Sequence, residues 1–219
     1  MILKTLLLTL ESDQPIKGKA HELRGYFANK FNDYILLHQH QFDKVIYQYP
    51  RIQFKMIENK PLILGLNEGT DVLVELQNKY EYIRLGENNY QIFEEGLSLK
   101  NQPFEATDNV FAYEFITPWF ALNQGNYQKF YNLPNKKSRD EFLSKILIGN
   151  LISISKSFGY TIPSKLSCSV ELKIRKGQMK DIKIMTFIGR FFINFNMPDF
   201  IGLGKSVSKG FGTIKKIGG

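Results

Sequence analysis

The period of the apolar residues changes several times along the first hundred positions, and each change predicts a new element. Residues 1–10 form a nearly continuous apolar run, which favours a buried strand. Ala20, Leu23, Phe27 and Phe31 then recur at steps of three and four, which places one apolar face on a helix of about three to four turns. The chain therefore opens with a strand followed by a helix.

Further segments complete a recognisable unit in the first half of the chain. Alternating or short apolar runs predict strands, and a capped amphipathic segment predicts a second helix over about residues 67–80. The strands are expected at residues 47–57, 61–66, 82–85 and 89–97. The order of strand, helix, two strands, helix and strand is that of a ferredoxin-like unit.

A turn-rich stretch at residues 100–109 predicts a domain boundary. Beyond it the pattern recurs as a strand, a long helix and a hairpin that turns at Lys176-Gly177, with these elements at residues 110–116, 138–158, 166–175 and 181–195. We therefore assign residues 1–100 to an N-terminal domain and residues 108–219 to a C-terminal domain.

The second ferredoxin-like pattern lacks its second helix. Residues 197–200 leave room for one helical turn at most before a glycine-rich segment begins. The predicted fold class is α+β, with tandem ferredoxin-like (RRM-like) domains, the second incomplete, and a C-terminal glycine-rich loop. Trp119 is the only tryptophan, and we expect it to pack in the core.

The composition is that of a folded chain, since 43% of its 219 residues are hydrophobic. The opening apolar run is interrupted by Lys4 and followed by Glu11, so it does not resemble a signal peptide. No apolar run approaches the roughly 18 residues of a membrane span, and we expect no membrane partner. Cys168 is the only cysteine, which excludes an internal disulfide and fits a cytoplasmic location.

The positive charge is concentrated near the end of the chain. The formal net charge is +8, and residues 165–219 carry 11 basic and 3 acidic residues while the preceding residues cancel. A basic footprint in one quarter of a chain favours nucleic acid as a partner. A merely solvated basic surface is the alternative interpretation.

Residues 202–213, here called the glycine-rich loop, combine glycines, lysines and serines without an acidic side chain. Glycine lacks the Cβ that blocks close approach, so backbone N–H groups, hydroxyls and ammonium groups could all reach phosphates. The candidate RNA-binding residues of the loop are Gly202, Gly204, Lys205, Ser206, Ser208, Lys209, Gly210, Phe211 and Gly212.

Other interpretations of the loop are weaker. A Walker loop would need a glycine where Asp199 stands. A flexible Gly/Ser tail is the structural alternative, although the apolar residues Phe211 and Ile214 argue against it.

All three histidines, His21, His38 and His40, lie within twenty residues of one another. A zinc site at His38 and His40 would need further ligands, and no Cys, His or acidic set completes it. Histidines at a helix end or on a surface loop are a second possibility. We favour acid–base chemistry, because the pKa of histidine suits both removal and delivery of a proton near neutrality. We expect no metal and no cofactor.

RNA provides a substrate for such a pair. A ribose 2′-hydroxyl can attack its own 3′-phosphodiester if one group removes its proton, another protonates the leaving 5′-oxygen, and a cation stabilises the phosphoryl oxygens. If residues 38–40 are extended, both histidine rings point to one side about 6.6 Å apart. Lys44 and Tyr34 lie close enough in sequence to assist, which makes His38, His40, Lys44 and Tyr34 the candidate catalytic residues.

Several segments carry a family resemblance: Leu23-Arg-Gly-Tyr-Phe27, Leu36-Leu-His-Gln-His40, Tyr49-Pro-Arg-Ile-Gln-Phe54 and the glycine-rich loop. In these the chain resembles the CRISPR repeat-processing endoribonucleases, the sixth family of Cas proteins in the RAMP superfamily. The resemblance implies metal-independent cleavage of precursor CRISPR RNA within each repeat, leaving a 5′-hydroxyl and a 2′,3′-cyclic phosphate. It also implies that the histidine after the first helix is catalytic and that the loop holds RNA.

The resemblance also sets expectations for partners. CRISPR repeat RNA is the expected ligand, with Arg24 of the first helix as a further RNA contact and a CRISPR effector complex as a further candidate partner. Because the chain offers both His38 and His40, the roles of base and acid stay paired. Monomer and homodimer both remain open.

A non-catalytic RNA-binding module is the alternative function. Lys209-Gly-Phe-Gly212 matches the first half of an RRM signature in which aromatic rings stack on bases. The second half fails, because Thr213-Ile-Lys-Lys216 lacks the aromatic residues.

Overall fold

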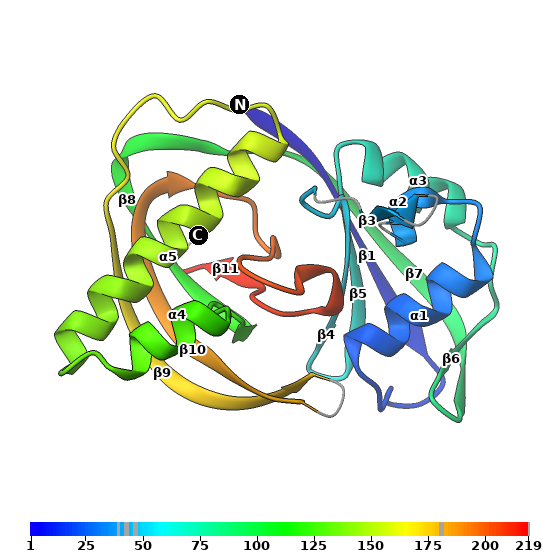
Figure 1. The fold of residues 1–219 in the computed structure, drawn as a ribbon. Coiled ribbons are helices and arrows are strands. Elements are labelled where there is room, and N and C mark those ends of the chain that lie inside the picture. The colour runs from blue at the N-terminus through cyan, green and yellow to red at the C-terminus, as the bar shows by residue number, and fades with distance from the viewer. Residues whose placement is uncertain (39, 42–43, 46–47, 180–181, 219) are drawn as a thin grey trace. The chain divides into compact units, whose positions relative to one another are not determined.

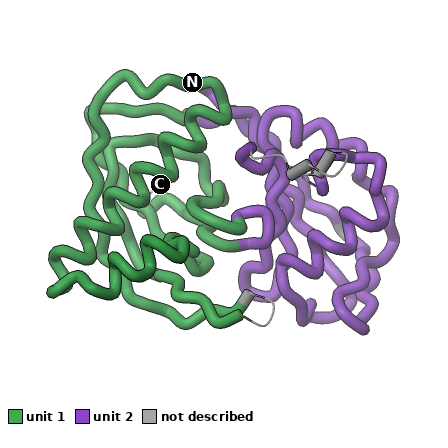
Figure 2. Tube along the Cα trace, viewed as in Figure 1, with its two compact units in different colours: residues 1, 103–206, 211–219 green, residues 2–102, 207–210 purple. Residues whose placement is uncertain are grey.

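The computed structural model describes residues 1–38, 40–41, 44–45, 48–179 and 182–218, and the side chains of His40, Gln41, Lys44, Val45, Glu94 and Met179 lie outside that description. The chain forms two compact units (Figure 2). The N-terminal unit comprises residues 2–102 and 207–210, and the C-terminal unit comprises residues 1, 103–206 and 211–219. Four residues of the glycine-rich loop therefore belong to the unit formed by the first half of the chain.

The N-terminal unit is built on a five-stranded sheet (Figure 1). Its spatial order is β4 (Ile52–Ile57), β5 (Lys60–Leu66), β1 (Ile2–Ser12), β7 (Asn88–Pro103) and β6 (Tyr82–Leu85). Helix α1 (Ala20–Lys30) follows β1, and α3 (Glu68–Leu76) follows β5. Sheet order 2-3-1-4 with a helix after the first and third strands is the ferredoxin-like arrangement, which confirms the predicted fold.

The core of this unit explains why α1 forms where its periodicity predicts. Leu23 and Phe27 are fully buried, and the ring of Phe27 packs 5.7 Å from Phe54 and 5.0 Å from Tyr80, measured between ring centroids. Residues of α3 such as Leu73 join the same cluster. Burial of an aromatic or leucine side chain contributes about 1.5–3 kcal/mol, so these contacts fix the helices on one face of the sheet.

The C-terminal unit repeats the arrangement with one element missing. Its sheet order is β11 (Ile214–Lys216), β8 (Glu105–Trp119), β10 (Ile182–Asn196) and β9 (Cys168–Met179). Helices α4 (Gln124–Tyr131) and α5 (Lys136–Ser157) lie between β8 and β9 in the chain. Between β10 and β11 the described chain contains only the 3-10 turn η1 (Val207–Lys209), so the second helix is absent and the prediction of an incomplete second fold is confirmed.

Trp119 lies in the core, as expected from the sequence. Its side chain is fully buried, its ring stacks on Phe115 with centroids 5.2 Å apart, and its Nε1 donates to Asn150 Oδ1 at 3.3 Å. The indole therefore buries its large apolar surface without leaving its N–H unpaired.

Two local predictions were wrong. Residues 100–103 and 105–109 are strand, so Phe104 alone separates β7 from β8 where a turn-rich stretch was expected. Gly177 lies inside β9 paired with Ile184, and the strand continues to Met179. In both places cross-strand hydrogen bonds outweigh the local preference of glycine, asparagine and proline for turns.

Three short elements follow α1. Helix α2 (Ile35–His38) leads into the strands β2 (His40–Gln41) and β3 (Lys44–Val45), which pair antiparallel with His40 opposite Val45. Among the described residues, no helix is both long and apolar enough to cross a membrane.

Candidate functional site

His38 is the last residue of α2, and the end of that helix is held by α1. The Arg24 guanidinium donates from Nη2 to the His38 carbonyl at 2.7 Å. The His38 side chain is half-buried, and its Nε2 atom is buried without a hydrogen bond to any residue that the structure describes. A buried ring nitrogen without a hydrogen-bond partner is unusual in a folded protein, which makes His38 a candidate for a functional role.

Arg24 of α1, which donates to the His38 carbonyl, has a partly buried side chain. Burial lowers the pKa of its guanidinium, which nevertheless remains a cation because arginine is charged at every physiological pH. Its bond to the His38 carbonyl gives it a positioning role that the sequence did not reveal. Its predicted contact with RNA stays a prediction.

The expected geometry of the two histidines was wrong at His38. That residue ends a helix, so residues 38–40 are not one extended segment and the spacing of two strand rises does not apply. His40 and Lys44 lie on the β2–β3 hairpin, where the backbone pairs His40 with Val45 and Gln41 with Lys44. Their side chains fall outside the described part of the structure.

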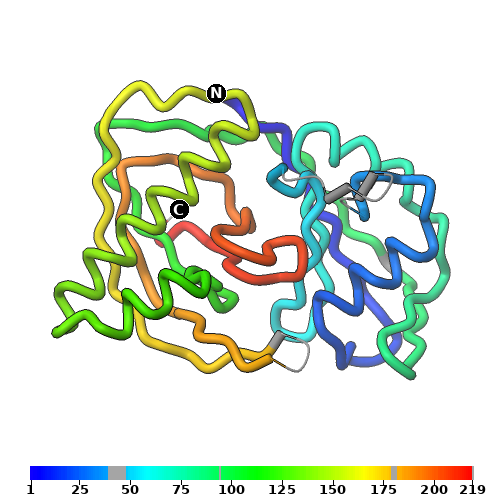
Figure 3. The backbone as a smooth tube through the Cα atoms, viewed as in Figure 1, coloured from blue at the N-terminus to red at the C-terminus, as the bar shows by residue number. Residues whose placement is uncertain are grey.

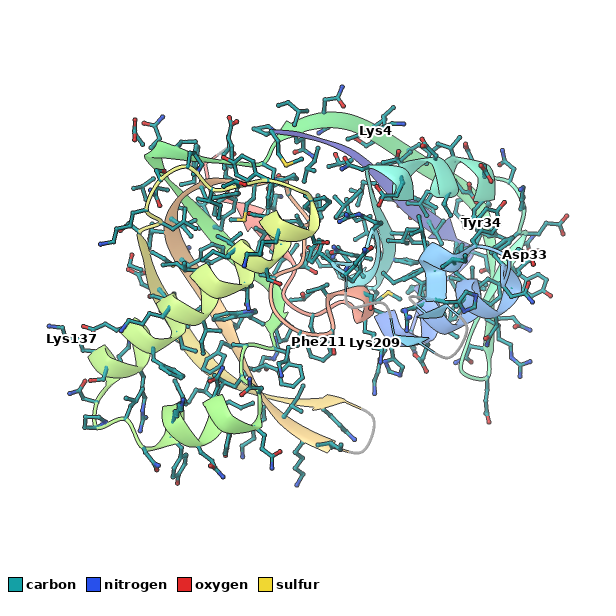
Figure 4. The ribbon with its side chains drawn as sticks, turned by 45° about the horizontal axis from the view of Figure 1, so that its top comes forward. Lys4, Asp33, Tyr34, Lys137, Lys209 and Phe211 are labelled. Atoms are coloured by element: carbon teal, nitrogen blue, oxygen red, sulfur yellow. The ribbon has the colours of Figure 1, made fainter. Side chains whose placement is uncertain are left out.

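Tyr34 lies just before α2 and has a cationic neighbour. Its hydroxyl accepts a hydrogen bond from Lys79 Nζ at 3.3 Å, and the same ammonium lies 5.8 Å from the centroid of the Tyr34 ring. The ring packs on the core cluster of the N-terminal unit, and Figure 4 labels Tyr34 beside Asp33. Sequence reasoning missed Lys79, because 45 positions separate the pair and no motif connects them.

His21 is exposed at the second position of α1. Burial lowers the pKa of its imidazole, Glu22 raises it, and Lys19 and Lys209 lower it further. The effect of Lys209 places the η1 turn of the glycine-rich loop near the start of α1. His21 is therefore separate from α2 in its surroundings, although it is close to it in sequence.

The η1 turn packs tightly inside the N-terminal unit. Gly210 has φ +87°, and a Cβ there would lie 2.6 Å from Ala20 Cβ and 3.3 Å from Phe54 O. Only glycine combines this backbone conformation with so close an approach. Lys209 is half-buried in the same turn and is labelled in Figure 4.

The rest of the loop is anchored in the C-terminal unit, and Figure 3 follows it as the orange and red tube leading to the C-terminus. Gly204 has φ +87°, and a Cβ there would lie 2.5 Å from Trp119 Nε1. Leu203 N donates to Gly212 O at 2.8 Å, while Leu203 is fully buried. This packing contradicts the interpretation of the segment as a flexible tail.

The internal hydrogen bonds of the loop change the expected reason for its glycines. The N–H groups of Lys205, Gly210 and Gly212 donate to the carbonyls of Phe120, Val207 and Pro118, at 2.9, 3.2 and 2.9 Å. These three N–H groups are therefore engaged within the protein, contrary to a row of N–H groups facing phosphate. At Gly204, Gly210 and Gly212 the absence of a Cβ serves close packing of the loop on its unit.

Other loop residues contribute accessible side chains. Lys205 is exposed, its ammonium lies 5.6 Å from the centroid of the Phe120 ring, and burial lowers its pKa. Phe211 is half-buried, with its ring centroid 6.1 Å from that of Phe120. Ser206 is half-buried, whereas Gly202 and Ser208 are buried. Lys205 is thus the most accessible of the predicted RNA contacts in the loop.

Lys55 of β4 is a titratable residue that the sequence did not single out. Its side chain is fully buried, its Nζ donates to the buried Gln53 Oε1 at 3.1 Å, and burial lowers the pKa of the amine to about 7. The alternation along β4 predicts Gln53 and Lys55 on a polar, exposed face. Tertiary packing buries both faces of the strand at these positions.

Among the described residues, no three His, Cys, Asp or Glu side chains meet as they would around a metal ion. The side chain of His40 lies outside that group of residues, so the alternative of a zinc site at His38 and His40 is not tested.

The two sheets and their connections define a protein of tandem ferredoxin-like folds, with a histidine-ended helix in one unit and a glycine-rich loop that contributes to both. Two family models match it: the Cas6b N-terminal domain over residues 1–103 and the Cas6b C-terminal domain over residues 105–217. The chain belongs to the Cas6b family. The resemblance to the sixth Cas family is thereby confirmed.

Solved structures support the same assignment. A crystal structure of Cas6b is 36% identical, covers 99% of this chain and 100% of its own, and superposes with a TM-score of 0.92. A crystal structure of a CRISPR RNA processing endoribonuclease Cas6b is also 36% identical, with coverage of 99% and 100% and a TM-score of 0.78. An uncharacterized protein of Methanocaldococcus jannaschii is 36% identical over 129 residues, which are 58% of this chain and 87% of that protein.

Proposed function

We propose that this protein is a CRISPR RNA processing endoribonuclease that cleaves precursor transcripts within their repeats, by attack of a ribose 2′-hydroxyl and without a metal ion. The observation that carries the proposal is membership in the Cas6b family over nearly the whole chain, together with 36% identity to a solved Cas6b described as a CRISPR RNA processing endoribonuclease. The proposed ligand is accordingly CRISPR repeat RNA.

The proposed reaction needs only proton transfers and stabilisation of charge. A base removes the 2′-hydroxyl proton, the 2′-oxygen forms a bond to the adjacent phosphorus, and the bond from phosphorus to the 5′-oxygen breaks. An acid delivers a proton to that 5′-oxygen as it leaves. The products are a 2′,3′-cyclic phosphate and a 5′-hydroxyl, which conserves atoms and charge across the step.

His38 and His40 are the proposed pair for these transfers. His38 supports the assignment because its buried Nε2 has no hydrogen bond to the described residues, while Arg24 holds the backbone of the same residue. His40 and Lys44 of the adjoining hairpin are the proposed second proton carrier and phosphoryl cation. The roles of base and acid are assigned to the two histidines as a pair and not to either one individually.

Tyr34 and the glycine-rich loop complete the proposal. The Tyr34 hydroxyl already accepts from Lys79, so its own proton is directed to a further acceptor, for which a phosphoryl oxygen is suitable. Lys205 and Lys209 are the proposed phosphate contacts of the loop. Arg24 contributes by positioning His38 and, as proposed from the sequence, by contacting RNA.

Cleavage of repeat RNA in EDTA tests the proposal. His38→Ala and His40→Ala should each slow cleavage by roughly 10²–10⁴-fold, the range for acid–base groups, while the Kd for RNA stays near that of the native protein. His21→Ala is the matched control, because His21 lies at the opposite end of α1 from α2. We expect it to cleave normally.

Further measurements distinguish an enzyme from an RNA-binding protein, and metal-free from metal-dependent cleavage. A substrate with 2′-deoxyribose at the scissile position should bind and remain intact, since its nucleophile is missing. Normal cutting of that substrate, or loss of cutting in EDTA, would refute the mechanism. RNA that is retarded on a native gel yet stays whole would favour the non-catalytic RNA-binding alternative.

A further inference from the structure

Helix α4 and the first turns of α5 form an exposed surface that the proposed chemistry does not use. Residues 124–139 include Lys129, Lys136, Lys137 and Arg139 but no aspartate or glutamate. The first three of these lysine and arginine side chains are exposed, and Figure 4 labels Lys137 at the N-terminal end of α5. All of them belong to the C-terminal unit, whereas His38 belongs to the N-terminal unit.

Two tyrosines give this surface an aromatic character. Tyr127 and Tyr131 are four residues apart on α4, so they lie on the same face of the helix. Their side chains are 43% and 67% exposed, and their rings stack with centroids 6.3 Å apart and planes 22° apart. Exposed parallel rings at this spacing are suited to contact with planar bases.

The tyrosines stand on a rigid support. Phe130, between them in sequence, is buried and packs edge-on against Phe187 of β10 with ring centroids 5.4 Å apart. Arg139 of α5 also contacts Phe130, with its guanidinium carbon 5.6 Å from the Phe130 ring centroid. Core packing at Phe130 therefore sets which face of α4 carries the two exposed rings.

A cavity of about 320 Å³ adjoins the same surface. Its lining combines apolar residues such as Phe130 and Phe187 with the charged residues Lys136, Arg139, Asp140 and Lys173. The Nε atom of Arg139 is buried and makes no hydrogen bond to the described residues. A buried donor of this kind is normally paired, so the geometry provides a place for an acceptor on a ligand.

The lysines at the start of α5 occupy positions that the helix dipole makes unfavourable for cations. Lys136 and Lys137 occupy the first turn, which contains no acidic residue, although the helix dipole makes that end positive. Within the described residues, the Asp140 carboxylate forms an ion pair with Lys136. Two cations in the first turn of a helix lower its stability, and an anion bound there would offset that cost.

From these observations we propose that Tyr127, Tyr131, Lys129, Lys136 and Lys137 form a second binding surface, for single-stranded RNA. Bases stack on the two tyrosines, phosphates contact the lysines, and Arg139 donates Nε to a ribose or base oxygen in the adjoining cavity. Aromatic rings beside several cations are typical of single-strand binding sites and complement a polyanion. The inference rests on the proposed function only in taking the RNA to be the transcript that is processed.

Binding of a labelled oligouridine of about 15 nucleotides tests this surface, with an abasic ribose-phosphate chain of equal length beside it. The double variant Tyr127→Ala/Tyr131→Ala should weaken oligouridine binding by roughly 10-fold or more, as stacking predicts, and leave abasic binding nearly unchanged. Tyr127→Phe/Tyr131→Phe keeps both rings and should retain the native affinity. Tyr82→Ala, which removes a 51% exposed tyrosine from the N-terminal unit, is the matched control.

The lysines have a separate signature. Lys136→Ala/Lys137→Ala should weaken binding of both the oligouridine and the abasic chain. It should also reduce the log–log salt slope by about 0.7 for each lost phosphate contact. Photocrosslinking of 4-thiouridine RNA to the native protein should label Tyr127 or Tyr131. Thermal melting of each variant shows whether the fold is retained.

The outcomes distinguish this inference from the proposed function. Unchanged affinity in the tyrosine-to-alanine and lysine-to-alanine double variants, with crosslinks elsewhere, would overturn the second surface even if repeat RNA is cleaved normally. The aromatic face would then be left to a protein partner. Conversely, weakened oligouridine binding in a protein that never cleaves repeat RNA would retain this surface and overturn the nuclease.

Discussion

At the scale of single residues, Lys55 is a position where burial opposes ionisation. Its pKa is lowered to about 7 when folded and is near 10.5 when unfolded, so the unfolded chain binds more protons between these values. The free energy of unfolding should therefore rise as pH increases from about 7 to about 10.5. We expect Lys55→Met to remove this component and to stabilise the protein at pH 7 by about 1–4 kcal/mol, because an apolar side chain needs no desolvation of charge. Urea unfolding of both proteins at pH 7 and pH 10 measures the difference, and an identical pH dependence in the two would contradict the assignment.

At the scale of elements, the glycine-rich loop depends on conformations and distances that only glycine permits. Gly212 has φ +66°, and a Cβ there would lie 1.9 Å from Leu203 O. Gly212→Ala should lower the free energy of unfolding by about 2–4 kcal/mol, combining left-handed strain with overpacking. Gly218 shares a positive φ but has no atom within 4 Å of its would-be Cβ, and Gly149 lies in α5 with equally open space. Gly218→Ala should therefore cost about 1 kcal/mol at most, and Gly149→Ala should be neutral or stabilising by up to about 1 kcal/mol. Equal thermal shifts in all three variants would show that the loop is not packed as described.

At the scale of the whole molecule, the uneven charge of the chain makes a prediction about salt. Residues 165–219 carry the whole positive excess, and within the loop Lys205 is exposed and Lys209 half-buried. Lys205→Ala/Lys209→Ala should weaken binding of repeat RNA and flatten the log–log salt slope by about 1.4, from two lost contacts with a single strand. Lys17→Ala/Lys100→Ala removes two exposed lysines of the N-terminal unit and the same total charge. A slope that falls equally in both double variants would mean that net charge, and not the loop, sets the affinity.

What the sequence by itself determined was the local periodicity, and with it the identity of most elements. The steps from Ala20 to Phe27 defined the buried face of α1, and the short span after β10 left no room for a second helix. Such features follow from backbone geometry over one or two turns, which the residue pattern specifies directly. The histidine and glycine-rich motifs also indicated the family without any knowledge of packing.

Only the tertiary structure decided which groups meet. It brought Lys79 to Tyr34, joined Arg24 to the carbonyl of His38, and buried Lys55 on a strand face that alternates like an exposed one. It also assigned residues 207–210 of the loop to the N-terminal unit. These contacts join positions far apart in the chain, and their energies depend on burial and distance, which no local pattern encodes.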